Sequence, residues 1–475
     1  MTFAEKVGAI NDVVNGFIWG LPMMILIVGT GIYLTCGIGF KQVSRFGYWI
    51  KKTIGAAFGK NKVEAKEGAI TPFQAVCTAL AGSIGTGNVA GVAGAIAIGG
   101  PGAVFWMLVA AFFGQATKFA EVTLAIKYRE RNKYGDWVGG PMYYIKNGLS
   151  KKWTWLAYVF SFLGLLCGFG IANLTQTNTI AGSIIYAVQA TNPNCNEGTI
   201  RLVIGIVLAI LCAIVIIGGI KRIGQACEVI VPFMAIGYIV IGLIVIFTHA
   251  QNIGPAFKAI FSGAFNPSAL GGGLAGTVMM TTLKKGVGRG LFSNEAGLGS
   301  APMGHAAAEV DHPVQQGIFG FLEVFMDTLV VCTLTALIIL CGLGLENVPF
   351  GVSAASELTA AGVASTFGNL FGRWFIAVAI ALFAFSSTLS WSVYGSRCAE
   401  FVFGEKAILP YKILWCIACI LGPTVSLDLV WGISDTLNGM MAIPNLVALL
   451  LLSPTVFQLT REYFEKVDAE RKAAK

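Results

Sequence analysis

The chain has 475 residues, of which 56% are hydrophobic and 12% are charged, and its mean hydropathy is +0.74. In a soluble domain, about a quarter of all residues are charged and cover its surface. This composition therefore excludes an ordinary soluble protein and predicts a surface that mostly faces lipid. The 32 Lys and Arg exceed the 24 Asp and Glu, which gives a formal net charge of +8. Because the excess lies in short loops between apolar stretches, it indicates membrane topology and not nucleic-acid binding.

Apolar stretches long enough to cross a bilayer recur along the whole chain. A helix needs about 20 apolar residues to span the hydrocarbon core, and several of these stretches are longer, which indicates tilt or interruption. We expect eleven spans, at residues 17–40, 71–98, 101–126, 153–190, 200–220, 227–247, 273–307, 314–343, 370–399, 409–423 and 428–457.

The distribution of basic residues predicts the orientation. Short loops rich in Lys and Arg mark the cytoplasmic side. The loop 127–152 and the C-terminal tail are rich in both, whereas the loop 345–369 contains neither. This alternation predicts an N-terminus outside and a C-terminus in the cytoplasm. Lys284, Lys285 and Arg289 do not fit, because they fall on the expected outer half of a span.

Two spans carry dense runs of Gly and small polar residues, at 82–88 and 288–302. Glycine costs up to about 1 kcal/mol in a helix interior. With the first span set aside, these runs open two sets of five spans, which predicts an inverted repeat with two broken helices. The expected division is 1–68 (first transmembrane helix and basic cytoplasmic loop), 69–248 (first repeat), 249–457 (second repeat with the extracellular loop before it) and 458–475 (cytoplasmic tail).

A helix break inside a membrane offers two kinds of partner. Unwound carbonyl groups can coordinate a hard cation such as Na⁺, and free amides at a new helix N-terminus suit a carboxylate. An amino-acid zwitterion needs both kinds. The alternative is that the glycines only allow close helix packing.

Three segments carry a family resemblance: 85–91 (GTGNVAG), 140–144 (GPMYY) and 289–302 (RGLFSNEAGLGSAP). They resemble the sodium:alanine (alanine or glycine:cation) symporter family, and the similarity covers nearly the whole chain. The resemblance implies an all-α, leucine-transporter-like 5+5 inverted repeat with one extra N-terminal transmembrane helix. It also implies that the protein takes up alanine or glycine together with Na⁺ by alternating access. The implied location is a bacterial or archaeal plasma membrane.

Other functions fit less well. The same fold could carry another small solute, or couple to H⁺ in place of Na⁺. A channel needs a continuous polar pore, whereas unequal helix breaks favour a closed site. The chain has three histidines and neither an HExxH nor a GxSxG motif, so no enzyme is expected. We expect no cofactor, no disulfide and no metal site other than for Na⁺ as coupling ion.

The substrate candidates lie at both breaks and on two other spans. Amides of the first break suit the substrate carboxylate, and an aromatic wall suits a small side chain. For Gln176 the family resemblance supports a place beside the substrate. Trp391 is expected either to cap the pocket or to pack between helices. The full set is Gly85, Thr86, Gly87, Gln176, Phe292 and Trp391.

The sodium candidates are oxygen-bearing side chains in the same spans. Asn88 is either a ligand or a cap of the break, and buried serines often bond back to their own helix. Asp327 and Glu323 share one helix face; a carboxylate at this depth usually marks an ion path, unless it pairs with a basic residue. We favour Asp327 of these two. The full set is Ser83, Asn88, Ser386, Ser387 and Asp327.

One further acid lies at membrane depth. Glu295 lies within the second glycine-rich run, six residues after Arg289. An acid in a span is functional by default, but a basic partner nearby offers a structural role. The sequence slightly favours an ion pair between these two residues that holds the second break closed.

Overall fold

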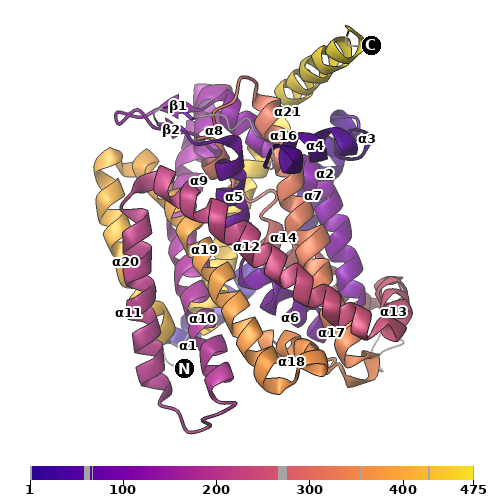
Figure 1. Ribbon diagram of the computed structural model, residues 1–475. Coiled ribbons are helices and arrows are strands. Elements are labelled where there is room, and N and C mark those ends of the chain that lie inside the picture. Colours follow the sequence, from indigo (N-terminus) through magenta and orange to yellow (C-terminus); the bar gives the residue numbers. More distant parts are fainter. Residues whose placement is uncertain are drawn as a thin grey trace.

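The computed structural model describes residues 3–57, 65–66, 68–265, 275–352, 355–425 and 428–473, which are almost entirely helical (Figure 1). The helices are α1 Phe3–Ile18, α2 Leu21–Gly37, α3 Lys41–Ser44, α4 Phe46–Ala57, α5 Pro72–Ser83, α6 Ala90–Gly99, α7 Gly102–Lys127, α8 Pro141–Gly148, α9 Thr154–Cys167, α10 Thr175–Val188, α11 Glu197–Ile216, α12 Gly219–Thr248, α13 Ile253–Phe265, α14 Ala275–Asn294, α15 Pro302–His305, α16 Pro313–Val324, α17 Thr333–Leu343, α18 Ser356–Phe367, α19 Asn369–Phe403, α20 Ile408–Thr424 and α21 Asp428–Ala473.

Shorter elements connect these helices. Strands β1 (Glu130–Arg131) and β2 (Trp137–Val138) form a small antiparallel hairpin. Two π-helical segments, Gly168–Leu174 and Phe325–Cys332, join α9 to α10 and α16 to α17. The 3-10 turns are Thr86–Asn88, Lys151–Trp153, Ala250–Asn252, Leu345–Asn347 and Glu405–Ala407.

The described helices account for ten of the eleven expected spans. Nine are long and apolar enough to cross a membrane, and α5 with α6 forms one more, bent by 59°. The expected span 273–307 does not qualify, because α14 carries three basic residues and the chain breaks after it. The start of that expected span, at Gly273, lies outside the described residues.

The first break lies where the glycine run predicts it. Helix α5 begins with a capping box, in which Thr71 and Gln74 exchange hydrogen bonds between side chain and backbone, and it ends at Ser83. The chain then makes a single 3-10 turn before α6 begins at Ala90. Every residue of this turn is buried, so the freed backbone groups face protein and not lipid, as a membrane requires.

The second break lies in the second half of the run 288–302. Helix α14 continues through Gly288 and Ser293 and ends at Asn294. A Cβ atom at Gly290 would lie 3.0 Å from Met107 Cγ of α7, so this glycine allows close packing. The break itself spans 295–301, where two glycines and one glutamate have positive φ. The predicted interruption therefore falls within the run 288–302, but the first part of that run, 288–294, is helical.

Equivalent members of the two sets of five pack against each other. Helix α7 contacts α16, α10 contacts α19, and α11 contacts α20. These are the second, third and fourth members of the two sets. The pairing is what an inverted repeat would produce, and the superposition of the two sets remains a prediction.

The molecule has two ends that differ in their elements (Figure 1). The β-hairpin, α8 and the C-terminus of α21 lie at one end, which we call the inner face. Helices α13 and α18 lie at the opposite end, which we call the outer face. The basic loop 127–152 belongs to the inner face, since it contains the hairpin and α8.

Candidate functional site

A cavity of about 440 Å³ leads from the outer end of α6 to the first break. Its lining extends from Ile98 to Thr86 and Gly87 in the break. Phe292 of α14 and Trp431 of α21 form one wall, with stacked rings whose centroids are 6.1 Å apart. A Cβ atom on Gly87 would lie 3.3 Å from the Phe292 ring, so the floor of the cavity is tight.

Hydrogen bonds from two side chains hold the first break. The Gly85 amide donates to Asn88 Oδ1 at 2.9 Å, and the Thr86 amide donates to Gln176 Oε1 at 3.3 Å. The Thr86 hydroxyl is buried without a hydrogen-bond partner. A buried hydroxyl without a partner is costly, and this one belongs to a residue that lines the cavity. The structure thus brings five of the six substrate candidates to one place.

Asp327 connects both broken helices. Its Oδ1 accepts from Asn88 Nδ2 at 2.7 Å and from Ser293 Oγ at 3.1 Å, and its Oδ2 accepts from Thr328 at 2.7 Å. All four side chains are buried, and the acid lies in the π-helical segment after α16. Such segments are frequent at functional sites. Among the described residues, no Lys, Arg or His pairs with this carboxylate.

Glu323, four residues earlier, has a different environment. Its Oε1 lies 3.1 Å from Lys118 Nζ and accepts from Ser83 Oγ at 2.7 Å. Its Oε2 lies 3.1 Å from His305 Nε2. All of these side chains are buried. The sequence leaves a basic partner open for both acids. Glu323 has such partners, in Lys118 and His305. Ser83 belongs to this cluster and not to the Asp327 cluster.

The second break is held by acids, but not by an Arg289–Glu295 ion pair. Glu295 accepts from Trp391 Nε1 at 2.7 Å and from Ser300 Oγ at 2.5 Å. Arg289 lies over the Phe292 ring, 5.6 Å from its centroid. The expected ion pair is therefore wrong, because Glu295 has φ +55° just after the helix end and turns toward Ser300 and α19.

Glu121 of α7 is a functional candidate that the sequence reasoning missed. Its Oε1 accepts from the amides of Gly297 and Gly299 at 3.0 and 3.1 Å, and from Asn445 Nδ2 at 2.5 Å. Both glycines have positive φ, so this carboxylate holds a left-handed loop that other residues would rarely adopt. Lys118 and Glu121 are charged residues inside an apolar span, and that signal was sufficient to find them.

The two sodium candidates on α19 differ in what they contact. Ser387 Oγ donates across to the Gly82 carbonyl of α5 at 3.1 Å. Ser386 Oγ donates to the Phe383 carbonyl of its own helix at 2.9 Å. Ser387 therefore joins α19 to the end of α5, whereas Ser386 bonds back to its own helix. Trp391, one turn further, points to the second break and does not line the outer cavity.

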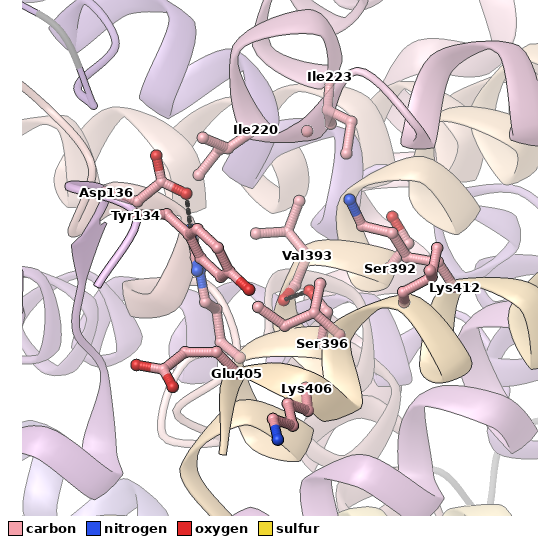
Figure 2. Close-up of a pocket in the computed structure, with 14 residues that line it drawn as sticks. Tyr134, Asp136, Ile220, Ile223, Ser392, Val393, Ser396, Glu405, Lys406 and Lys412 are labelled. Carbon is pink, nitrogen blue, oxygen red and sulfur yellow. Dashed lines mark hydrogen bonds and ion pairs between the residues drawn. The ribbon is translucent and has the colours of Figure 1, made fainter. Parts of the chain in front are cut away.

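A second cavity of about 440 Å³ is lined by Tyr134 and Asp136 of the loop between β1 and β2, and so belongs to the inner face. Ser392, Val393 and Ser396 of α19 line it together with Lys406 and Lys412 (Figure 2). No residue of either break is among those that line it. Of these two cavities, only the outer one reaches the first break. The cavity that reaches the first break is therefore the one that extends toward the outer end of α6.

Two broken helices around buried carboxylates are the arrangement expected of a secondary transporter, and comparison with solved structures gives the fold. The transporter MhsT in complex with L-phenylalanine superposes with a TM-score of 0.58, at 12% identity over 83% of this chain and 99% of that one. The fold is leucine-transporter-like, as the sequence predicts.

Residues 4–475 match the model of the Sodium:alanine symporter family, and the chain belongs to this family. The sodium/alanine symporter AgcS of Methanococcus maripaludis is 46% identical over 98% of both chains. A probable sodium/glutamine symporter, GlnT of Bacillus subtilis, is 36% identical over 96% of this chain and 90% of that one. The chain is thus an integral membrane protein that couples amino-acid transport to Na⁺, and not an enzyme.

Proposed function

We propose that this chain takes up alanine or glycine with Na⁺ by alternating access, and that the first break binds both solutes. The observation that carries the proposal is the Asp327 carboxylate, which is buried among neutral donors beside that break. A buried carboxylate needs a compensating charge. Na⁺ bound at Asp327 supplies it, because the oxygens of Asp327 and Ser293 suit a small hard cation. Asn88 joins them as a ligand when its amide oxygen turns from the Gly85 amide toward the ion.

A small amino acid fits the remaining space. The substrate carboxylate replaces the Asn88 and Gln176 oxygens as acceptor of the Gly85 and Thr86 amides. The Thr86 hydroxyl gains the partner that it lacks. The tight approach of Phe292 to Gly87 restricts the substrate side chain. The alanine transport named for the relative AgcS agrees with a small side chain. Gln176, which contacts the Thr86 amide, completes this part of the site.

Further sodium contacts and the topology belong to the same proposal. Ser387 and the Gly82 carbonyl provide oxygens for a second Na⁺ between α19 and α5. The N-terminus lies outside and the C-terminus in the cytoplasm, because the basic loop 127–152 belongs to the inner face. The two repeats, 69–248 and 249–457, then move against each other around the shared site.

Coupling between the two solutes tests this function. If Na⁺ tightens alanine binding, linkage requires that alanine tightens Na⁺ binding by the same factor, typically about 5- to 150-fold. Calorimetry on the purified protein should therefore show much weaker alanine binding in choline chloride than in NaCl. Asn88→Ala should shrink the difference, since Asn88 contacts both Gly85 and Asp327.

A matched control is Asn178→Ala on α10. Asn178 donates to the Gly422 carbonyl of α20 and touches neither break, so the Na⁺ effect should persist in this variant. Glycine, serine and glutamine tested beside alanine measure the size limit. Equal alanine affinities in both salts would contradict a shared site.

A further inference from the structure

Three basic side chains on α14 have no role in the site described so far. Lys285 and Arg289 line the outer cavity above the first break, while Lys284 lines only a neighbouring cavity of about 240 Å³. Lys285 and Arg289 are half-buried. In the described part of the chain, none of the three forms an ion pair with a carboxylate. Cations at this depth are costly and usually mark a solute path.

Two glycines of α6 lie beside these two side chains. A Cβ atom on Gly91 would lie 3.9 Å from Arg289 Cδ, and one on Gly99 would lie 3.1 Å from Lys285 Cβ. Both glycines lie on the α6 surface that faces α14. The two basic side chains therefore lie close to α6, along the cavity that extends from its outer end to Thr86 and Gly87.

The acid that shares a cavity with this pair makes no ion pair with it. Asp435 of α21 lines the neighbouring cavity together with both basic residues. Its Oδ2 accepts from Asn15 Nδ2 of α1 at 3.0 Å, and it makes no ion pair with Lys285 or Arg289. The N–H donors of both side chains therefore have no protein acceptor among the described residues. They are available to an anionic group in the outer cavity.

We infer that Lys285 and Arg289 form an outer subsite for the carboxylate of the incoming amino acid, a step that rests on the proposed function. The subsite holds the zwitterion by charge-assisted hydrogen bonds, which are stronger than neutral ones. It presents the carboxylate ahead of the ammonium to the amides of the first break. Because the amino acid leaves the subsite when it reaches the break, the subsite speeds association and dissociation without changing the final affinity.

The two solutes should respond in opposite directions to loss of this charge. A positive subsite attracts a carboxylate but repels Na⁺, which must reach the Asp327 cluster through the same cavity. The double variant Lys285→Gln/Arg289→Gln should slow alanine association about tenfold, the equivalent of one charge-assisted hydrogen bond. It should speed Na⁺ association. A purely structural defect would slow both.

The experiment measures association rates by stopped-flow tryptophan fluorescence and equilibrium affinity by calorimetry, on the purified full chain in NaCl. Lys284→Gln is the matched control, because it removes the same charge from the adjacent residue outside the outer cavity. Lys285→Arg should keep the alanine rate of the unmodified protein. Propionate, a carboxylate without an ammonium, should slow alanine association in the unmodified protein but not in the double variant.

The outcomes separate this inference from the proposed function. Slower alanine association, faster Na⁺ association and unchanged alanine affinity in the double variant support the subsite. An alanine rate equal to that of Lys284→Gln overturns it while leaving the proposed function intact. Loss of alanine affinity at an unchanged association rate overturns it by placing the two side chains in the main site. If the unmodified chain binds no alanine in NaCl, the proposed function fails and the subsite fails with it.

Discussion

Glu323 and Asp327 are two buried carboxylates one helical turn apart on the same face, and their surroundings are opposite in character. Glu323 lies 3.1 Å from the Lys118 ammonium and 3.1 Å from His305. Asp327 is surrounded by an amide, two hydroxyls and the thiol of Cys332, which contacts its Asn88 and Ser293 partners. Each carboxylate is fully buried.

The difference separates a structural charge from a functional one. An ion pair that is satisfied within the protein makes the position of its helices specific but needs no ligand. A buried carboxylate with only neutral donors remains short of positive charge, and a transported cation can supply it. Lys118 compensates the charge of Glu323, whereas we propose that Na⁺ compensates the charge of Asp327.

The largest expected effect comes from Asp327→Asn. Removing the charge that faces Na⁺ should weaken Na⁺ binding by about 2–5 kcal/mol, roughly 30-fold or more, as for a truncated buried charge pair. Na⁺-dependent alanine uptake into proteoliposomes should be abolished at about 0.15 M Na⁺, which is physiological ionic strength. NaCl should no longer raise the melting temperature above that in choline chloride, since a ligand stabilises only the state that binds it.

The control for this variant is its stability without Na⁺, which shows whether it is still folded. Asp327→Asn should be no less stable than the unmodified chain in choline chloride, because it removes an uncompensated buried charge. If Asp327→Asn still shows Na⁺-dependent uptake, then Asp327 is not the acid that Na⁺ compensates, and the proposed difference from Glu323 is contradicted.

Glu323→Gln should instead lower stability. It leaves the Lys118 ammonium buried without its partner, which costs about 3–5 kcal/mol. Thermal unfolding in detergent should show a lower midpoint, and Lys118→Met in the same chain should restore most of it. Alanine affinity should still depend on Na⁺ in the double variant. Loss of that dependence would show that the Glu323–Lys118 pair also takes part in coupling.

The sequence predicts the fold and the first break well, because the signals there are local. Apolar stretches report spans, and the glycine run 82–88 coincides with the interruption between α5 and α6. Asp327 stands out as an acid in an apolar stretch, whatever its partners are. For these features, no knowledge of tertiary neighbours is needed.

The partners of charged residues could not be predicted in the same way. Lys118 and Glu323 come from separate helices, so only the packing of α7 on α16 brings them together. Gly290 and Gly297 look alike in sequence, yet the first packs in a helix against Met107 and the second lies in a loop held by Glu121. Tertiary contacts, and not local composition, decide which glycine belongs to the break.

The smallest expected effect sharpens the same comparison on α19, where two neighbouring serines differ as the two acids do. Ser387→Ala removes a hydroxyl that faces the Gly82 carbonyl across the helix boundary, whereas Ser386→Ala removes one that bonds to its own helix. Loss of a neutral oxygen ligand costs about 1 kcal/mol, roughly fivefold in affinity. The Na⁺ concentration for half-maximal uptake should therefore rise about that much in Ser387→Ala at saturating alanine, and hardly at all in Ser386→Ala. Uptake measured over a series of Na⁺ concentrations checks both variants in the same liposome preparation. If the two serine variants respond alike, then the hydroxyl of Ser387 only joins two helices, and the second sodium position between α19 and α5 must be abandoned.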